Sequence, residues 1–237
     1  ESFMSIAKKS WIVAIVVFSI LVIDQVLKIY IKTNFEYGGG FDIMGWSWAK
    51  IHFVENEGMA FGMTFGGSTG KLILSLFRLV MISVLIFLIY RIIRAGAKLS
   101  LILSFAMILT GALGNMIDSA FYGLIFSETP MYHGGIATMF PEGGGYAPFL
   151  YGKVVDMFYF PMIDTVLPEW IPLMGGERFR FFNPVFNIAD SMITIGTLSL
   201  LLFHRRFFTE ESKKKEQESV SDVQTPSQED QQNEEKL

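Results

Sequence analysis

The sequence predicts an all-α membrane protein with a small β element, and three observations indicate this fold class. Hydrophobic residues make up 51% of the 237 positions, and the mean hydropathy is positive, which is outside the usual range of a soluble domain. Four apolar stretches approach the roughly 20 residues that a helix needs to cross the hydrocarbon of a membrane. Between the first two stretches, a run of aromatic and β-branched residues is typical of a strand.

We expect four transmembrane helices. The first apolar stretch has the two lysines in front that a secretory signal peptide would have. It is too long for one, contains Asp24 and lacks a small-x-small cleavage site, so we interpret it as a retained span. The predicted spans cover residues 11–31, 72–90, 99–117 and about 185–203.

Basic residues predict the orientation of these spans. Ten Lys and Arg side chains lie in the short flanks on one side, whereas the two long loops on the other side, residues 34–70 and 118–184, hold four. By the positive-inside rule, both termini are cytoplasmic and both long loops lie outside. Residues 1–10 then form a cytoplasmic N-terminus and residues 11–208 a membrane domain. Residues 209–237 carry nine acidic and four basic side chains and no aromatic residue, which predicts a disordered cytoplasmic tail.

The outer loops contain two predicted strands. Residues 46–54 follow three consecutive glycines and partly alternate in polarity, which predicts a strand with Trp46 and Trp48 in the headgroup layer. Residues 154–160 form an apolar run that is too short to cross the bilayer and is closed by a proline. This run is expected to be a strand or an interfacial segment that carries Asp156 to the outer ends of the helices.

Charged residues within the predicted spans are candidates for function, because a charge is costly to keep in hydrocarbon. Asp24 and Arg78 each lie seven residues from the outer end of their span, which at 1.5 Å per residue is about 10 Å below the outer surface. The two side chains are expected to be close enough to pair. Lys28 is a second partner for Asp24, since it lies four residues later on the same helical face. We favour a structural ion pair that neutralises buried charge, and substrate positioning is the alternative.

Asp118, Asp156 and Asp190 come from distant parts of the chain and converge on the outer side of the predicted membrane domain. Two carboxyl groups held close together in a low dielectric share one proton, which provides a base and an acid at neutral pH. The base can activate water while the acid polarises a carbonyl, so peptide hydrolysis needs no covalent intermediate. Spacing and depth leave open whether Asp118 or Asp156 is the partner of Asp190.

Other chemistries have little basis in the composition. Cysteine is absent, and the three histidines show neither the HExxH spacing of zinc proteases nor a serine in a nucleophile-elbow setting. We therefore expect no thiol nucleophile, no metal and no other cofactor.

Five blocks of sequence resemble the lipoprotein signal peptidases, also called signal peptidase II, which are aspartyl proteases of the bacterial inner membrane. Together with the four predicted spans, the blocks cover nearly all of residues 11–203. The blocks are Asp24-Gln25-Val26-Leu27-Lys28, Asn56-Glu57-Gly58-Met59-Ala60-Phe61-Gly62, Gly114-Asn115-Met116-Ile117-Asp118, Gly152-Lys153-Val154-Val155-Asp156-Met157-Phe158 and Phe186-Asn187-Ile188-Ala189-Asp190-Ser191.

This resemblance implies four transmembrane helices with an extracytoplasmic β-cradle and a periplasmic helix above the site. It implies that Asp156 and Asp190 form the catalytic pair. It also implies a prolipoprotein substrate whose cysteine carries a diacylglyceryl group, cleavage just before that cysteine, and inhibition by the cyclic peptide globomycin. Membrane lipids are the other expected partners, and nucleic acid is not one. The residues implied to bind substrate or support the site are Asp24, Lys28, Asn56, Gly58, Ala60, Phe61, Gly114, Asn115, Asp118, Asn187 and Ala189.

The chain departs from the family pattern in two places. The block that ends at Asp118 is usually followed by an arginine, and here that residue is Ser119. The connection from Asp118 to Asp156 is also longer than usual, with the glycine-rich residues 124–150 as an insertion whose role is open. Our hypothesis for the missing cation is Arg178 or Arg180, just before the last predicted span.

Two other function classes fit parts of the pattern. A proton- or cation-coupled carrier would use Asp24, Asp118 and Asp190 as relay groups, but such carriers usually show internal repeats and broken helices, and we find neither. A structural or assembly factor would leave the aspartate motifs without a purpose. The sequence therefore favours a membrane aspartyl endopeptidase that acts on lipid-modified precursors.

Overall fold

The computed structural model describes residues 4–58, 67–132, 134–172, 175–181, 183–205 and 207, without the side chains of Asp164, Arg180 and Phe181. The chain divides into two compact units, residues 1–197 and 198–237. All side chains discussed as part of the site belong to the first unit. The predicted tail, residues 209–237, lies outside the described residues.

Three helices are long and apolar enough to cross a membrane: α1 (Ile6–Asn34), α2 (Gly67–Arg94) and α3 (Leu99–Ile117), which continues to Ile125. The fourth, α5 (Ile188–Phe203), has 16 residues and spans about 24 Å at 1.5 Å per residue, less than the roughly 30 Å of a hydrocarbon core. Its first predicted residues instead form a strand, because Val185 and Phe186 pair with β3 (Val154–Tyr159). Three of the four predicted spans thus correspond to helices that are long and apolar enough to cross a membrane, and the fourth stays a prediction.

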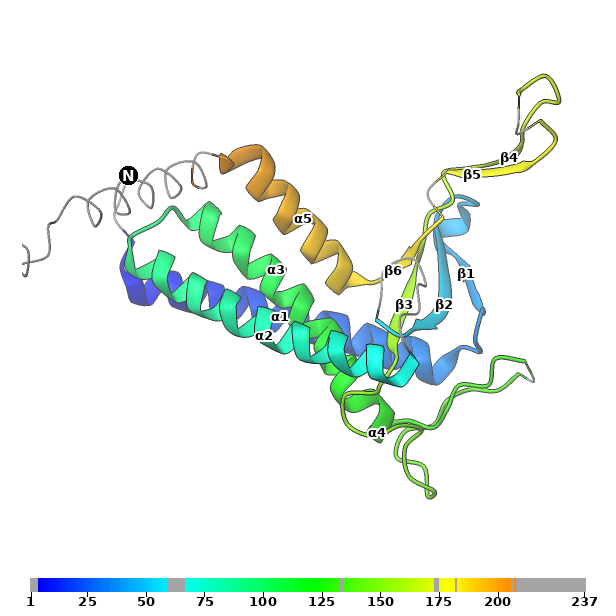
Figure 1. Cartoon of the computed structure of the whole chain (residues 1–237), viewed down its shortest axis with the longest axis horizontal. Coiled ribbons are helices and arrows are strands. Elements are labelled where there is room, and N and C mark those ends of the chain that lie inside the picture. Colours follow the sequence, from blue (N-terminus) through cyan, green and yellow to red (C-terminus); the bar gives the residue numbers. More distant parts are fainter. Residues whose placement is uncertain are drawn as a thin grey trace, which may run out of the picture. The chain divides into compact units, whose positions relative to one another are not determined.

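Helix α3 is the most enclosed of the three and packs against both α1 and α2 (Figure 1). Its glycines allow helix α5 to approach closely, because a side chain at Gly111 would collide with the backbone carbonyl of Ala189. After Ile117 the helix widens into a π-helical turn, η3 (Asp118–Tyr122), followed by the short α4 (Gly123–Ile125). Such turns are rare and frequently occur at functional sites.

The predicted β element is a four-stranded antiparallel sheet in the order β1-β2-β3-β6, where β1 is Gly40–Asp42, β2 is Lys50–Asn56 and β6 is Val185–Phe186. Strands β4 (Ile163–Val166) and β5 (Arg178–Phe181) form a separate hairpin. The strand predicted over residues 46–54 begins later than expected, since residues 46–49 form a turn after the 3-10 turn η1 (Ile43–Gly45). The indole rings of Trp46 and Trp48 stack there at 5.2 Å, which fixes the turn.

The sheet rests on a core at the C-terminal end of α1 and at η3. Val155 and Met157 from β3 pack there with Phe53 from β2, and all three side chains are fully buried. Apart from η1, η3, α4 and the start of α2, the described parts of residues 34–70 and 118–184 hold no helix that could correspond to the implied periplasmic helix. Residues 59–66 lie outside the described part.

The insertion, residues 124–150, packs against this core over part of its length. Phe126 is fully buried, and Lys32 of α1 lies 5.4 Å from the centre of its ring and 5.2 Å from that of Tyr146. The same lysine is ion-paired with Glu55 of β2 and donates to Thr129 Oγ1 at 2.9 Å. The buried side chain of Lys32 therefore contacts both the insertion and the sheet.

Candidate active site

Asp156 lies in the middle of β3, where the antiparallel register places it opposite Val54 of β2. Its side chain is 3% exposed. Asn56, at the end of β2, donates its amide to Asp156 Oδ2, and Asn187 Nδ2 donates to Asp156 Oδ1 at 2.7 Å. Both oxygens of this buried carboxyl group are therefore held by asparagine side chains from distant parts of the chain.

Asp190 is fixed by the start of α5. Asn187 precedes the helix, and its Oδ1 accepts the backbone N–H of Asp190 at 2.8 Å, while Asp190 Oδ2 accepts the backbone N–H of Asn187 at 3.3 Å. This reciprocal arrangement is a capping box, with Asn and Asp in the places where Ser/Thr and Glu are most common.

Asn115 links the two aspartates. Its Nδ2 donates to Asp190 Oδ1 at 2.7 Å, and its Oδ1 accepts from Asn187 Nδ2 at 3.1 Å. Because Asn187 also donates to Asp156, a single chain of hydrogen bonds runs from Asp156 to Asp190. The two carboxyl groups thus belong to one network.

Asp118 has a different position. It is fully buried, and its Oδ2 lies 2.8 Å from Lys28 Nζ and accepts the backbone N–H of Val155 at 3.3 Å. Gln25 Nε2 donates to its other oxygen at 2.9 Å. Asp118 is therefore saturated by groups that hold β3 against the helices, whereas Asp156 lies in the network with Asp190.

Lys28 is the cation at the base of the site. Its ammonium group is fully buried and lies 3.0 Å from Asp24 Oδ2, and it donates to Asn115 Oδ1 at 3.1 Å. The other oxygen of Asp24 accepts the backbone N–H of Ala189 at 3.1 Å. Asp24 is thus paired with Lys28, and the expected pair between Asp24 and Arg78 is not formed.

Arg78 instead extends from α2 to Gly58 and Ser119. It donates to the backbone oxygen of Gly58 and, through NH1, to Ser119 Oγ at 3.2 Å. The carboxylates that contribute most to its electrostatic environment are Asp190, Asp118 and Asp156. Sequence reasoning had assigned Arg78 to Asp24 and so missed this contact with Ser119, the residue at which the family pattern has an arginine.

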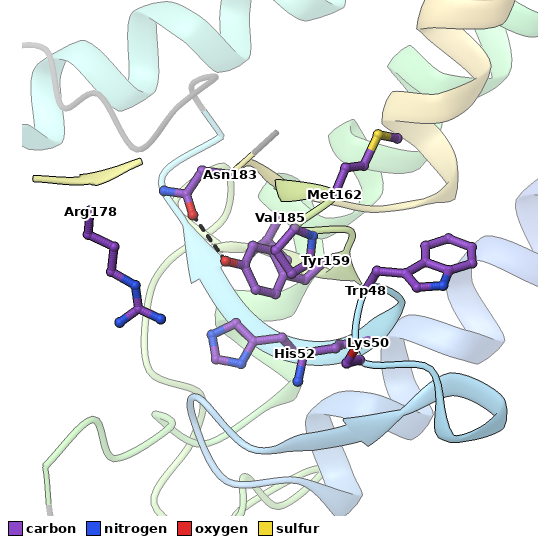
Figure 2. Close-up of a pocket in the computed structure, with 10 residues that line it drawn as sticks. Trp48, Lys50, His52, Tyr159, Met162, Arg178, Asn183 and Val185 are labelled. Carbon is purple, nitrogen blue, oxygen red and sulfur yellow. Dashed lines mark hydrogen bonds between the residues drawn. The ribbon is translucent and has the colours of Figure 1, made fainter. Parts of the chain in front are cut away.

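The hypothesis that Arg178 or Arg180 supplies the missing cation stays a prediction. Arg178 of β5 lines a pocket of about 880 Å³ with Trp48, Lys50, His52 and other residues of the outer loops (Figure 2). Tyr159 of β3 also lines this pocket, three residues from Asp156, and side chains three apart on a strand point to opposite faces of the sheet. The pocket therefore lies on the other face from Asp156. The side chain of Arg180 is outside the described structure.

The remaining predicted site residues are partly accounted for. Gly58 has a φ of 91°, a conformation that favours glycine, and its N–H donates to Asn56 Oδ1. Ala60 and Phe61 lie outside the described residues. Within the described part of the chain, no cluster of three or more His, Asp or Glu side chains could hold a metal ion.

Burial and the negative charge of Asp190 together raise the pKa of Asp156 well above that of a free carboxyl group. Burial is the larger cause, and Lys28 and the hydrogen bond from Asn187 oppose it. Asp156 therefore retains a proton more readily than a free carboxyl group does.

Gly114 makes the contact of three helices possible, and this gives a test of the packing beneath the site. A Cβ at this position would lie 2.8 Å from Asp24 Oδ2 and 2.9 Å from Ala189 Cβ. We expect Gly114→Ala to destabilise the protein by about 1–3 kcal/mol, as overpacked positions do, and to lower its thermal unfolding temperature in detergent.

The matched control is Gly143→Ala, because a Cβ at Gly143 meets no atom within 4 Å. Its unfolding temperature should equal that of the wild type. Equal unfolding temperatures for both variants would contradict the close contact described at Gly114.

A comparison with protein families matches residues 16–206 to the family described as Signal peptidase (SPase) II. The matched range contains the whole network of Asp24, Asp118, Asp156 and Asp190 described above.

Individual relatives agree with this match. The chain is 47% identical over 206 residues to a lipoprotein signal peptidase of Porphyromonas gingivalis, which covers 86% of this chain and 88% of that protein. It is 33% identical over 218 residues to a lipoprotein signal peptidase of Amoebophilus asiaticus, which covers 91% and 86% of the two chains.

The fold is similar to that of solved structures. Two of them, both described as a bacterial membrane enzyme solved by the in meso method, match with TM-scores of 0.50 and 0.51 at 22% identity. The matches cover 85% and 80% of this chain and 90% of each solved chain.

Proposed function

Because the chain belongs to the signal peptidase II family, we propose that it cleaves lipoprotein precursors with Asp156 and Asp190 as its catalytic pair. Family membership makes it a multi-pass protease of the bacterial inner membrane that removes signal peptides from prolipoproteins. The observation that carries the proposed mechanism is the hydrogen-bond chain that joins the two carboxyl groups through Asn187 and Asn115.

In the proposed reaction, the pair holds one proton in the resting state. The raised pKa of Asp156 favours that proton on Asp156, so the negative charge of the pair lies on Asp190. Asp190 takes a proton from water as the water oxygen attacks the scissile carbonyl carbon, and Asp156 donates its proton to the carbonyl oxygen. The hydrated intermediate then breaks its C–N bond, the proton taken by Asp190 passes to the leaving amine, and the hydroxyl proton returns to Asp156.

The substrate in this proposal is a precursor whose cysteine carries a diacylglyceryl group, and the amine that leaves is that of the lipid-modified cysteine. We place the site at the outer leaflet, with both termini in the cytoplasm, as the distribution of basic residues indicates. Helix α5 is proposed as the fourth span, and residues 1–10 and 209–237 as cytoplasmic segments. Globomycin is expected to compete with the precursor.

The carrier alternative gains no support from the site. A relay needs carboxyl groups that exchange protons along a path, but Asp24 and Asp118 are both buried and both bound to Lys28. Their charges are neutralised within the protein, which suits a structural role.

The function is tested with the purified full chain in lipid and a diacylglyceryl-modified precursor, with mass spectrometry of the products. We expect cleavage directly before the modified cysteine, and no cleavage of the same precursor without the lipid. Cleavage at another bond, or equal cleavage of the unmodified precursor, would count against the proposed substrate.

The same assay tests the shared proton. The pH profile of kcat should be bell-shaped, since activity is lost when both carboxyl groups are protonated and again when both are ionised. The alkaline limb should lie well above the pKa of a free carboxyl group, because the pKa of Asp156 is raised. A flat profile through the neutral range would contradict a pair that shares one proton.

A further inference from the structure

Arg78 has two partners in the described structure, and neither carries a charge. One is the backbone oxygen of Gly58 and the other is the hydroxyl group of Ser119. A guanidinium group has five N–H donors in a planar fork, so these two bonds leave further donors for another acceptor.

The surrounding charges make this arrangement unusual for a structural arginine. In the described part of the chain, no carboxylate oxygen lies within 4 Å of Arg78, and the carboxylates of Asp24 and Asp118 are bound to Lys28. Asp190, Asp118 and Asp156 still act on Arg78 at longer range. A partly buried cation without a direct counter-ion is costly to keep at this depth, which indicates a functional role.

Ser119 makes room for this guanidinium. The side chain is 1% exposed, and its hydroxyl group donates to the backbone oxygen of Asn115 at 3.0 Å while it accepts from Arg78. Asn115 in turn donates to Asp190, so the arginine is two hydrogen-bonded residues away from the catalytic pair. The small Ser119 side chain lets a cation enter from α2 at the place where one from η3 would otherwise stand.

We propose that Arg78 is a substrate-positioning residue, whose free N–H donors bind a backbone carbonyl oxygen of the precursor beside the scissile bond. This inference rests on the proposed peptidase function. Gly58 and Ser119 hold the guanidinium plane in place, and the donors that remain match a peptide carbonyl in the low dielectric of the site. The positive charge of Arg78 also favours the state in which one carboxyl group of the pair is ionised.

The test compares four variants with the wild type on the lipid-modified precursor: Arg78→Gln, Arg78→Lys, the double variant Arg78→Gln/Ser119→Arg, and the control Arg91→Gln. Arg91 lies in the last turn of the same helix, far along the chain from the site. Arg78→Gln should lower kcat/KM by about 10²-fold or more, as the loss of one donor from an oxyanion-type site does. The control should match the wild type.

Two further readouts separate positioning from a structural role. In the described part of the chain, the charged groups near the pair are Lys28 and Asp24 from α1, Asp118 from η3 and Arg78 from α2. Removal of one cation raises the pKa of nearby carboxyl groups, so both limbs of the pH profile should move to higher pH in Arg78→Gln. Arg78→Lys keeps the charge but loses the planar set of guanidinium donors. Its pH profile should therefore match that of the wild type, while its KM should rise. The double variant should recover most of the lost kcat/KM, because it returns a guanidinium from the adjacent position.

Unchanged kcat/KM in a folded Arg78→Gln variant would overturn the proposal. The proposal would also be overturned if the double variant did not recover kcat/KM and the pH profile of Arg78→Gln did not shift. Thermal unfolding of each variant in detergent shows whether it is folded. If Arg78→Gln does not fold, the activities of Arg78→Lys and the double variant test the proposal instead. Failure of the wild type to cleave the precursor would instead reject the proposed function itself.

Discussion

Asp156→Asn and Asp190→Asn are each expected to reduce cleavage of the lipid-modified precursor by at least about 10³-fold. Each substitution keeps the size of the side chain but removes either the proton donor or the base, and general acid–base catalysis contributes about 10²–10⁴ for each group. The effects should not add in the double variant, because the two carboxyl groups act as one unit. Single-turnover cleavage with excess enzyme provides the measurement.

The structure also predicts how far each variant keeps its fold. Asp156 accepts amide donors from Asn56 and Asn187, so Asp156→Asn places an amide next to one of these donors unless a neighbour rotates. Asp190→Asn can still accept from Asn115. Asp42→Asn is the matched control, because Asp42 forms an exposed ion pair with Lys50 on β1 and β2. Full activity in either active-site variant would remove that residue from the pair, and Asp118 would then be the candidate.

Lys28→Met is expected to destabilise the protein more than any other single change considered for the helices. Lys28 is fully buried between Asp24 and Asp118, and its removal leaves two carboxylates without their cation. Loss of one partner from a buried ion pair typically costs about 3–5 kcal/mol. Thermal unfolding in detergent should show a much lower midpoint, and cleavage should be lost because Asn115 loses one of its partners.

Lys50→Met serves as the control for this substitution. Its ion pair with Asp42 has side chains that are 35% and 45% exposed, and such pairs contribute about 0–1 kcal/mol. A similar unfolding midpoint for Lys28→Met and Lys50→Met would show that the cation does not hold the three segments together. Lys28→Met/Asp118→Asn should recover part of the stability, since it removes one of the uncompensated charges.

The sequence identified residues that the structure brings together, but it placed the boundaries of the elements less accurately. Charged and amide residues in apolar surroundings are costly, so their positions alone identify Asp24, Lys28, Asp156 and Asp190 as members of a special region. The structure brings these residues together in one connected network. Spacing and depth left the choice between Asp118 and Asp156 open, and the family resemblance favoured Asp156. In the structure, Lys28 and Gln25 bind the carboxyl group of Asp118.

Other features depended on tertiary contacts that a linear pattern does not contain. Depth along each helix placed Asp24 and Arg78 at the same level, but depth does not show which faces of α1 and α2 meet. The start of α5 was predicted too early, since the apolar residues Val185 and Phe186 fit a strand as well as a helix. The spacing of Asn187 and Asp190 did contain a usable signal, because Asn-x-x-Asp matches the spacing of a capping box and marks the true start of the helix.

The four-residue spacing of Asp24 and Lys28 also affects how the protein is made. Helix α1 is synthesised and inserted before α3 exists, so at that stage Asp118 is not yet there to balance the lysine. The two side chains lie one turn apart on one helix and neutralise each other, which lowers the cost of placing either charge in lipid. Assembly of the bundle then converts a local pair within α1 into a bridge between helices. The spacing thus allows the two charges to enter the membrane already paired, before α3 adds Asp118.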